Sequence, residues 1–177
     1  SRPGSVGQGC ILIAILGAMR FFPLSRPTSE KSDGIPNADM SDIIVVDPNA
    51  QDKEAAFANA IIAGSTSDGR VMKLIVNDIS VGDDRQVRVG DTVTVHYIGL
   101  LKDGPEFDNS YAKGTPLSFK VGAGEVIEGW ERGIIGMKEG GERILVVPAS
   151  MVYGSNVVDP LPANATLIFS IELLAIE

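Results

Sequence analysis

The residues best suited to chemistry in this chain are aromatic, and three of them end in a polar group. A tyrosine or tryptophan in a core needs a partner for its hydroxyl or indole N–H. Where the core supplies none, such side chains line a cleft and direct hydrogen-bond donors into it. From the residues alone, two interpretations stay open, an aromatic filling of an aliphatic core or an apolar pocket with a few donors. The residues in question are Tyr97, Phe107, Trp130, Tyr153 and Phe169.

Motifs for covalent, metal-dependent or nucleotide chemistry are missing from the sequence. One cysteine excludes an internal disulfide framework and a cysteine-built zinc site, and one histidine, His96, excludes a multi-histidine metal site. There is no Walker loop, and Gly122-x-Gly124 lacks the third glycine of a dinucleotide-binding loop. The acidic pair Asp83-Asp84 lies in a predicted turn, where solvation explains it better than catalysis does. We therefore expect neither a metal nor a cofactor.

The composition suits one ordinary domain with an N-terminal extension. The chain has 177 residues, of which 44% are hydrophobic and 21% charged, so it can bury a core. Its formal net charge of −8 and isoelectric point of about 4.6 argue against a nucleic-acid-binding surface. We therefore expect no nucleic acid among its partners.

The chain begins with an apolar segment. Residues 10–19 (CILIAILGAM) form an apolar run that is shorter than the roughly 20 residues of a membrane span but within the about 7–15 of a signal-peptide core. We expect residues 1–24 to be an apolar signal or anchor segment, truncated if the true N-terminus precedes Ser1. Membrane attachment through residues 10–24 would follow, with export to the periplasm or cell surface of a prokaryote. The alternative is a cytoplasmic protein whose tail is buried or disordered.

Residues 25–70 are predicted to be a linker that contains a short helix. Residues 25–42 are rich in Ser, Pro, Asp and Gly, a composition typical of flexible linkers. A short strand-like run follows over Ile43–Val46. Asp47-Pro48 is typical of a helix start and Gly64 of a helix end, so we expect a helix between them.

From Val71 onward the pattern indicates an α+β domain. Apolar residues alternate with polar ones in several short runs, which is typical of strands with one buried face. Four apolar residues recur at the spacing of one amphipathic helix: Ile127, Trp130, Ile134 and Met137. We expect a five- to six-stranded antiparallel sheet curled around this one short helix, which covers the apolar face of the sheet. The strands are expected at residues 71–76, 92–101, around 107–108, 117–121, 142–147 and from 167 onward.

Several separated motifs in this region resemble the FKBP-type peptidyl-prolyl cis-trans isomerases. They are VTVHYIGLLKDGPEFDNS from Val93, GEVIEGWERGIIGMKEGGERILVVP from Gly124, and VYG from Val152 followed by PLPANATLIFSIELLAIE from Pro160. The motifs occur in the order and at the spacing of that family. The resemblance implies an FKBP-like fold and a single FKBP-type isomerase domain at residues 71–177.

The same resemblance implies an aromatic pocket that binds a proline ring, with Trp130 as its floor. In this family a backbone N–H and a tyrosine hydroxyl bind substrate or macrolide carbonyl groups, which implies those roles for Ile127 and Tyr153. Asp108 is expected at the polar rim, and Glu125 is expected to contribute a backbone carbonyl. The residues implied to be catalytic are Tyr97, Asp108, Ile127 and Tyr153. Those implied to bind substrate are Phe107, Leu117, Glu125, Val126, Trp130, Leu161 and Phe169.

Three features depart from the family's pattern. Leu117 replaces an aromatic wall residue of many members, and Lys113 replaces an arginine that some members have near the aspartate and tyrosine. A lysine cannot reproduce the planar fork of donors in arginine, so we expect a less rigid polar rim. The loop between Tyr153 and Pro162 is about one residue shorter than in the best-known single-domain members, whose pattern implies Leu161 as a flap contact. His96 adjoins the implied site in sequence, but alternation puts its side chain on the opposite face of the strand.

The function implied by the resemblance is peptidyl-prolyl cis-trans isomerisation in folding proteins, without covalent chemistry. The partners would be proline-containing polypeptides, and rapamycin-type macrolides would act as inhibitors. A second hypothesis is a binding module for macrolides or proline motifs, or a chaperone, without significant turnover. A third is a dimeric holdase joined through the helix near residues 48–63. We expect a monomer, because the dimerising helices of relatives are much longer.

Overall fold

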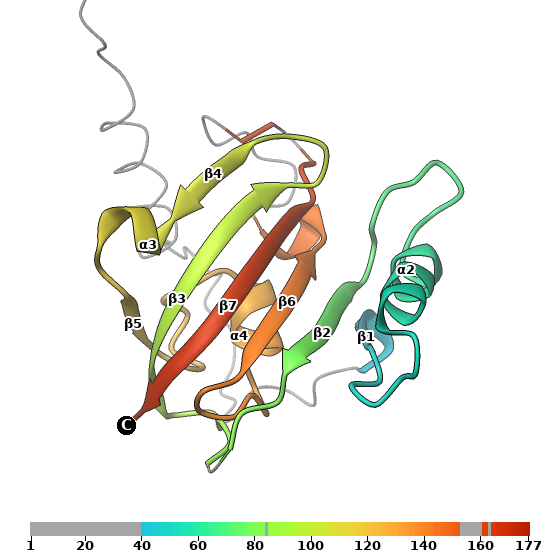
Figure 1. Ribbon diagram of the computed structural model, residues 1–177. Coiled ribbons are helices and arrows are strands. Elements are labelled where there is room, and N and C mark those ends of the chain that lie inside the picture. The colour runs from blue at the N-terminus through green and yellow to red at the C-terminus, as the bar shows by residue number, and fades with distance from the viewer. Residues whose placement is uncertain (1–39, 84, 153–160, 163) are drawn as a thin grey trace, which may run out of the picture.

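The computed structural model describes residues 40–83, 85–152, 161–162 and 164–177, and its centre is one twisted sheet (Figure 1). The strand order is β1-β2-β6-β7-β3-β4, and β5 also pairs with β3. The β1–β2 pair is parallel and the others are antiparallel. The strands are β1 (Ile43–Val45), β2 (Leu74–Ser80), β3 (Thr92–Leu101), β4 (Glu106–Asn109), β5 (Leu117–Lys120), β6 (Glu142–Val147) and β7 (Leu167–Ile176). The helices are η1 (Met40–Asp42), α2 (Lys53–Ala63), α3 (Ser110–Lys113), α4 (Glu128–Gly133) and η2 (Ala149–Met151).

The larger core lies between the sheet and α4, which sits behind β6 and β7 in the view of Figure 1. Trp130 on α4, Leu145 on β6 and Phe169 on β7 are all completely buried there. The prediction that one short helix covers the apolar face of the sheet is therefore confirmed.

Two glycines on one side of α4 allow the helix to approach β6 closely. A Cβ atom at Gly129 would lie 2.4 Å from Cγ1 of Val147, and one at Gly133 would lie 2.7 Å from both Cδ atoms of Leu145. Contacts this short require the neighbouring side chains to move. The glycines thus fix the depth at which the helix places Trp130 in the core.

The C-terminal end of α4 is held by an arginine from the sheet. Nη1 of Arg143 donates to the carbonyl oxygens of Gly133 (2.7 Å) and Ile135 (3.1 Å), which satisfies acceptors that a helix end leaves unpaired. Nε and Nη2 of the same side chain donate to the two oxygens of Asp78 at 2.6 and 3.0 Å. This bidentate pair ties the helix end to β6 and β2 at once.

A second, smaller core lies where α2 packs against β2 and β6. Ala60 of α2, Ile75 of β2 and Val146 of β6 are buried in it. The neighbours of these strand residues, Leu74 and Leu145 among them, belong to the larger core. Both faces of these parts of β2 and β6 are therefore covered, which explains why Leu74–Val76 and Ile144–Val147 are continuously apolar rather than alternating.

The predicted fold class is confirmed, with differences at the N-terminal edge of the sheet. β3 and β6 have the predicted bounds, and the predicted strand at residues 43–46 appears as β1. It pairs in parallel with β2, Ile43 opposite Leu74, and so adds a strand to the five or six expected. The predicted helix start at Asp47-Pro48 is wrong. Asp47 instead accepts from the Asn49 N–H in a turn, and Asp52 caps the helix by accepting from Ala55 N–H at 2.9 Å.

The helices in the structure also differ in extent from those predicted from the sequence. α4 ends at Gly133, and Met137 of the predicted periodic pattern reaches the core from the turn that follows. α3 was not predicted, because four residues are too few to show a helical period. The division of the chain at residues 24 and 70 stays a prediction. Within the ranges that the structure describes, no helix has the length and apolar character needed to cross a membrane.

Candidate functional site

Trp130 on α4 is the centre of an aromatic cluster to which four strands contribute. Its ring centroid lies 5.0 Å from that of Tyr97 on β3 and 5.2 Å from that of Phe169 on β7, and both contacts are edge-to-face. Phe119 on β5 contacts it at 5.8 Å in a tilted arrangement, and Phe107 on β4 extends the cluster through Phe169 at 5.8 Å. Edge-to-face contacts of this kind stabilise aromatic pairs by about 0.5–1.5 kcal/mol beyond their buried area.

The indole N–H of Trp130 has no hydrogen-bond partner among the described residues, although the side chain is completely buried. A buried donor left unpaired costs roughly 1–3 kcal/mol. Such a group is retained in a core where a partner arrives with a ligand or where another constraint fixes the ring. The unpaired donor therefore favours the interpretation of this cluster as a binding site rather than a core filling.

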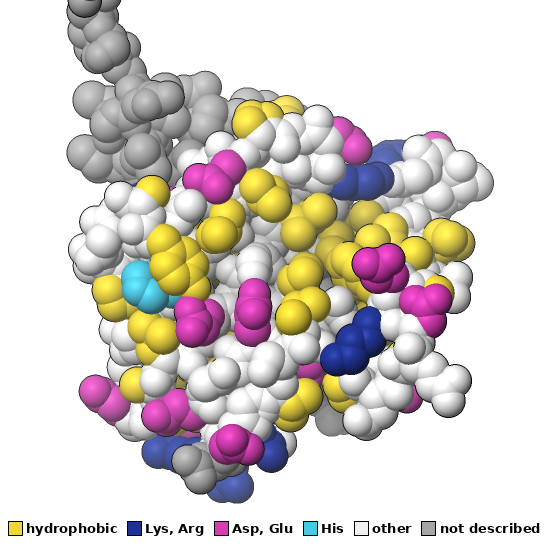
Figure 2. Space-filling view, viewed as in Figure 1, with side chains coloured by type: hydrophobic (Ala, Val, Ile, Leu, Met, Phe, Trp, Pro, Cys, Tyr) yellow, Lys and Arg dark blue, Asp and Glu magenta, His cyan; other side chains and the backbone are white. Residues whose placement is uncertain are grey.

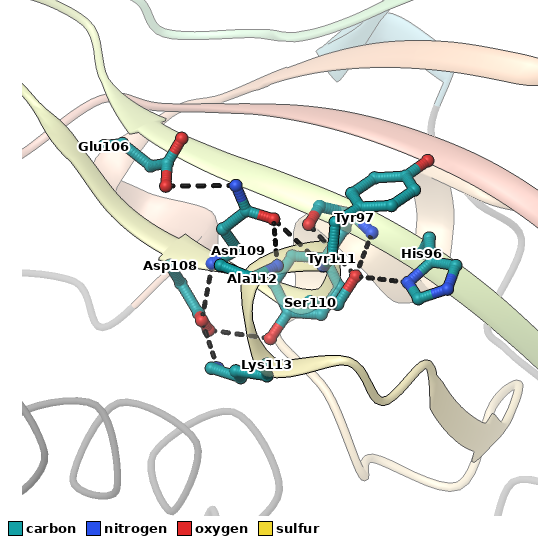
Figure 3. Close-up of polar contacts among 9 residues, drawn as sticks. All are labelled: His96, Tyr97, Glu106, Asp108, Asn109, Ser110, Tyr111, Ala112 and Lys113. Carbon is teal, nitrogen blue, oxygen red and sulfur yellow. Dashed lines mark hydrogen bonds and ion pairs between the residues drawn. The ribbon is translucent and has the colours of Figure 1, made fainter.

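A polar network joins the cluster at Tyr97. The Tyr97 hydroxyl donates to Oδ2 of Asp108 at 2.7 Å, and Lys113 Nζ forms an ion pair with Oδ1 of the same carboxylate (Figure 3). The N–H of Asn109 also donates to Oδ1, at 2.8 Å. Nζ of Lys113 lies 5.9 Å from the centroid of the Tyr97 ring, within reach of a cation–π attraction.

The Asp108 side chain is completely buried, whereas Lys113 keeps 19% of its side chain exposed. The carboxylate is therefore enclosed, and its expected place at the polar rim of a pocket stays a prediction. A buried charge is tolerated when it is paired and hydrogen-bonded, and both conditions hold here. Lys113 occupies the role expected of an arginine, with a single ammonium in place of a planar fork.

The segment that precedes α4 is shaped by a buried carboxylate. Glu131 accepts hydrogen bonds from the N–H groups of Gly122 and Gly124, the latter at 2.9 Å. Burial raises the pKa of the Glu131 carboxyl above its usual range, against the opposing effect of these hydrogen bonds. The loop it holds leads directly to Val126 and Ile127, both of which are buried against the core.

Ile127 presents a backbone donor next to the cluster. Its carbonyl accepts from the N–H groups of Trp130 (3.0 Å) and Glu131 (3.1 Å) at the start of α4. Its own N–H has no acceptor among the described residues. The family resemblance implies that the N–H of Ile127 binds a substrate carbonyl group. That role stays a prediction.

The structure brings most of the predicted site residues together. Those that belong to or pack against the larger core are Tyr97, Phe107, Leu117, Val126, Ile127, Trp130, Leu161 and Phe169. Asp108 joins them through Tyr97. Glu125 is exposed, and its carboxylate accepts from the N–H of Lys120 at 2.9 Å. Tyr153 lies outside the described residues.

Sequence reasoning missed three residues of this region. Phe119 follows Leu117 by two positions, so alternation along β5 could have placed its ring beside Trp130. Ser110 and Glu131 carry no comparable signal, because their hydrogen bonds to backbone N–H groups depend on how neighbouring segments fold against them.

The outer face of the sheet carries a separate polar group. His96 stacks on Tyr111 with ring centroids 4.3 Å apart, and the Tyr111 hydroxyl donates to Glu172 at 2.5 Å. Figure 2 shows the one histidine of the chain at the surface, next to a hydrophobic side chain and near acidic ones. The prediction that His96 lies on the opposite face from Tyr97 is therefore confirmed. Across the described residues, no group of three His, Cys, Asp or Glu side chains could hold a metal ion.

Comparison with known proteins gives one family match, two similar proteins and one similar structure. Residues 83–174 match the sequence model of a family described as FKBP-type peptidyl-prolyl cis-trans isomerase. The chain is similar to FK506-binding protein 4 of Gibberella zeae, with 46% identity over 128 residues, which is 72% of this chain and 24% of that protein. It is similar to FK506-binding protein 2 of the same organism, with 44% identity over 71% of this chain and 65% of that protein. The crystal structure of FkpA from Escherichia coli superposes with a TM-score of 0.57 and 37% identity, covering 73% of this chain and 61% of that one. The chain thus spans less than two thirds of each of these relatives.

Proposed function

Because the chain belongs to the FKBP-type peptidyl-prolyl cis-trans isomerase family, we propose that it accelerates rotation about X–Pro peptide bonds in folding proteins. The observation that carries the proposal is the aromatic cluster around Trp130, whose buried indole N–H has no partner among the described residues. This cluster supplies apolar surface for a proline ring. The Ile127 N–H beside it supplies a donor for a carbonyl group.

The chemistry required is rotation, not bond cleavage. Resonance places a barrier of about 18–20 kcal/mol on rotation about a peptide C–N bond, so an X–Pro bond isomerises in tens to hundreds of seconds without a catalyst. In the twisted transition state that resonance is lost, and the amide is less polar than when planar. An apolar site that excludes water favours the twisted form over the planar one. Every 1.4 kcal/mol of this preference gives about a tenfold rate increase.

The residues would act by holding the substrate while the bond turns. We assign the proline ring to the surface formed by Trp130 and Phe169, and the preceding carbonyl to the N–H of Ile127. The Asp108–Tyr97 hydrogen bond keeps the tyrosine ring in its edge-to-face contact with Trp130 and thereby fixes the wall of the site. The Tyr153 hydroxyl would be a second donor.

The same surface would bind macrolides. FK506-binding proteins are among the relatives, and their names state that they bind FK506. We propose that FK506- and rapamycin-type macrolides occupy the site over Trp130 and compete with proline-containing polypeptides. Leu117 favours a second candidate function, binding without significant turnover, because an aliphatic wall contacts less of a bound ring than an aromatic one does.

We also propose where the protein acts and that it acts as a monomer. The apolar run at residues 10–19 supports export to the periplasm or cell surface, with or without attachment to a membrane through residues 10–24. α2 supports a monomer, since its Ala60 faces the second core and the helix has only 11 residues. Cell fractionation tests the first point and gel filtration of the full chain tests the second.

The function is tested by measuring cis-to-trans relaxation of a series of proline tetrapeptides with the full chain. We expect acceleration that a rapamycin-type macrolide blocks and that falls in the Trp130→Leu and Asp108→Ala variants. Macrolide binding without acceleration would support the binding module and overturn the isomerase. Neither binding nor acceleration would mean that the family membership describes the fold alone.

A further inference from the structure

Ser110 connects the backbone of Tyr97 to the segment that carries Asp108 and Lys113. Its hydroxyl oxygen accepts from the N–H of Tyr97 at 2.8 Å, and the hydroxyl lies 3.2 Å from the Tyr97 carbonyl oxygen, to which it donates. Ser110 is 1% exposed. Tyr97 is therefore held at three atoms by one short segment, its hydroxyl by Asp108 and its two backbone groups by Ser110 (Figure 3).

The position of Ser110 in the sheet explains this contact. One edge of β3 is paired with β4 as far as Ile98, opposite Asn109, and with β5 from Val95, opposite Leu117. Between these two ladders the backbone of Tyr97 faces neither β4 nor β5. The Ser110 hydroxyl takes the place of a strand there and pairs with both the N–H and the carbonyl of Tyr97.

We propose that Ser110 is a positioning residue of the isomerase site, which sets the distance between Tyr97 and the Asp108–Lys113 pair. The inference rests on the proposed function. Ser110 follows Asp108 by two residues and is the first residue of α3, which ends at Lys113. If the segment from Asp108 to Lys113 shifts away from β3, the Asp108 carboxylate and the Lys113 ammonium move with it. Since the Tyr97 ring contacts Trp130, the shift also loosens the wall of the site.

His96 is the third partner of the hydroxyl and anchors it from the outer face. Its Nδ1 lies 2.8 Å from Oγ of Ser110. A serine hydroxyl has one proton and two acceptor positions. In the tautomer that carries its proton on Nδ1, His96 donates to Oγ, and the bonds to the Tyr97 N–H, the Tyr97 carbonyl and the histidine use the full capacity of the hydroxyl. A hydroxyl saturated in this way has one orientation, as a positioning group requires.

The inference is tested with Ser110→Ala in the full chain, and Ser118→Ala is the matched control. Ser118 also bridges to β3, through a 2.7 Å contact with Thr94 Oγ1, but it is exposed, and this side-chain contact involves no residue of the site. The tests are tetrapeptide isomerisation, urea unfolding and the NMR resonance of the Asp108 carboxyl carbon. Assays are run at urea concentrations where both variants are folded.

We expect Ser110→Ala to lower kcat/KM about tenfold, the factor that 1.4 kcal/mol gives, and to shift the Asp108 resonance in the folded protein. Ser118→Ala should change neither. A merely structural role would lower the unfolding midpoint and leave the resonance unchanged, and this result would overturn the inference. The resonance decides the inference even if the wild-type chain fails to accelerate isomerisation, a result that would refute the proposed function separately.

Discussion

The phenol hydroxyl of Tyr97 donates a 2.7 Å hydrogen bond to the carboxylate of Asp108 across the β3–β4 pair. The two side chains are almost wholly buried, and the negative charge is balanced by Lys113. The Asp108 carboxylate can therefore fix the position of the Tyr97 ring, and its own charge is paired with Lys113 rather than left unpaired in the core.

Replacement of the cation should be costly. In Lys113→Met the Asp108 carboxylate keeps its bonds from Tyr97 and the Asn109 N–H but loses its counter-charge. Breaking a buried ion pair costs up to about 3–5 kcal/mol, and we expect a loss of stability approaching that range, with lower isomerase activity. Lys113→Arg should retain both. Urea unfolding measures the effect, with Lys120→Met, at an exposed position of β5, as the control. Equal stability of the two methionine variants would show that the ion pair contributes nothing.

The depth of Trp130 in the core should depend on Gly129. In Gly129→Ala the new methyl group would meet Cγ1 of Val147 at 2.4 Å. Overpacking of this kind costs about 1–3 kcal/mol, and the displaced helix should also weaken macrolide binding, measured by the fluorescence of this single tryptophan.

The double variant Gly129→Ala/Val147→Ala gives the matched control. Removal of the valine methyl groups makes room for the new one, so the two substitutions should be non-additive by about 0.5–3 kcal/mol in the favourable direction. Strict additivity of the two unfolding free energies would mean that the close approach of α4 to β6 does not limit the position of Trp130.

The sequence predicts the parts of this fold that repeat a pattern or bury one face. The alternation along β3 places Tyr97 inward and His96 outward, as observed. The parallel pairing of β1 is not predictable in this way, because three residues carry no register and their partner strand lies beyond α2. A continuous apolar run such as that of β2 shows that both faces are covered, but not what covers them.

The residues of the site likewise fall into those that a sequence pattern predicts and those that it does not. The residues of the aromatic cluster can be found from the family resemblance, and Phe119 from alternation with Leu117. Ser110 cannot, since a serine in a turn is usually solvated or caps a helix. Its role follows only from the gap between β4 and β5, which exists in three dimensions and has no sequence signature.

Glu131 should make stability fall as pH rises in the mildly acidic range. Burial raises the pKa of its carboxyl above the ordinary value of 4.5. Between that value and the raised pKa, the folded state binds more protons than the unfolded state, so the unfolding free energy decreases with pH by at most about 1.4 kcal/mol per unit.

The comparison for this prediction is Glu131→Gln, which does not titrate. The glutamine loses one acceptor for the N–H groups of Gly122 and Gly124, and that cost does not depend on pH. We therefore expect the stability of the wild type relative to the variant to be greatest near pH 4 and to decline toward neutrality in urea unfolding experiments. A relative stability that increases with pH would contradict the burial of this carboxyl as the dominant effect.

Tyr111 should titrate later than an ordinary tyrosine. Partial burial raises the pKa of its hydroxyl to about 12, with further contributions from its hydrogen bond to Glu172 and from the negative charges of Glu172 and Glu142. The ordinary value is 10.0. Because the folded state holds this proton more tightly, its contribution to stability is complete below pH 10 and is lost as pH rises toward 12.

The pKa of Tyr111 is measured from the tyrosinate absorbance of the folded protein as pH rises. The chain has three tyrosines, so the Tyr111 step is identified with variants. Tyr111→Phe should remove the step near pH 12, and Glu172→Gln should move it toward lower pH, because the neutral amide removes the charge that opposes ionisation. A Tyr111 step that stays in place in Glu172→Gln would leave partial burial and the charge of Glu142 as the causes. A step near pH 10 in the wild type would show that the hydroxyl is not held by the carboxylate, which would leave the stack with His96 to keep the ring on the sheet.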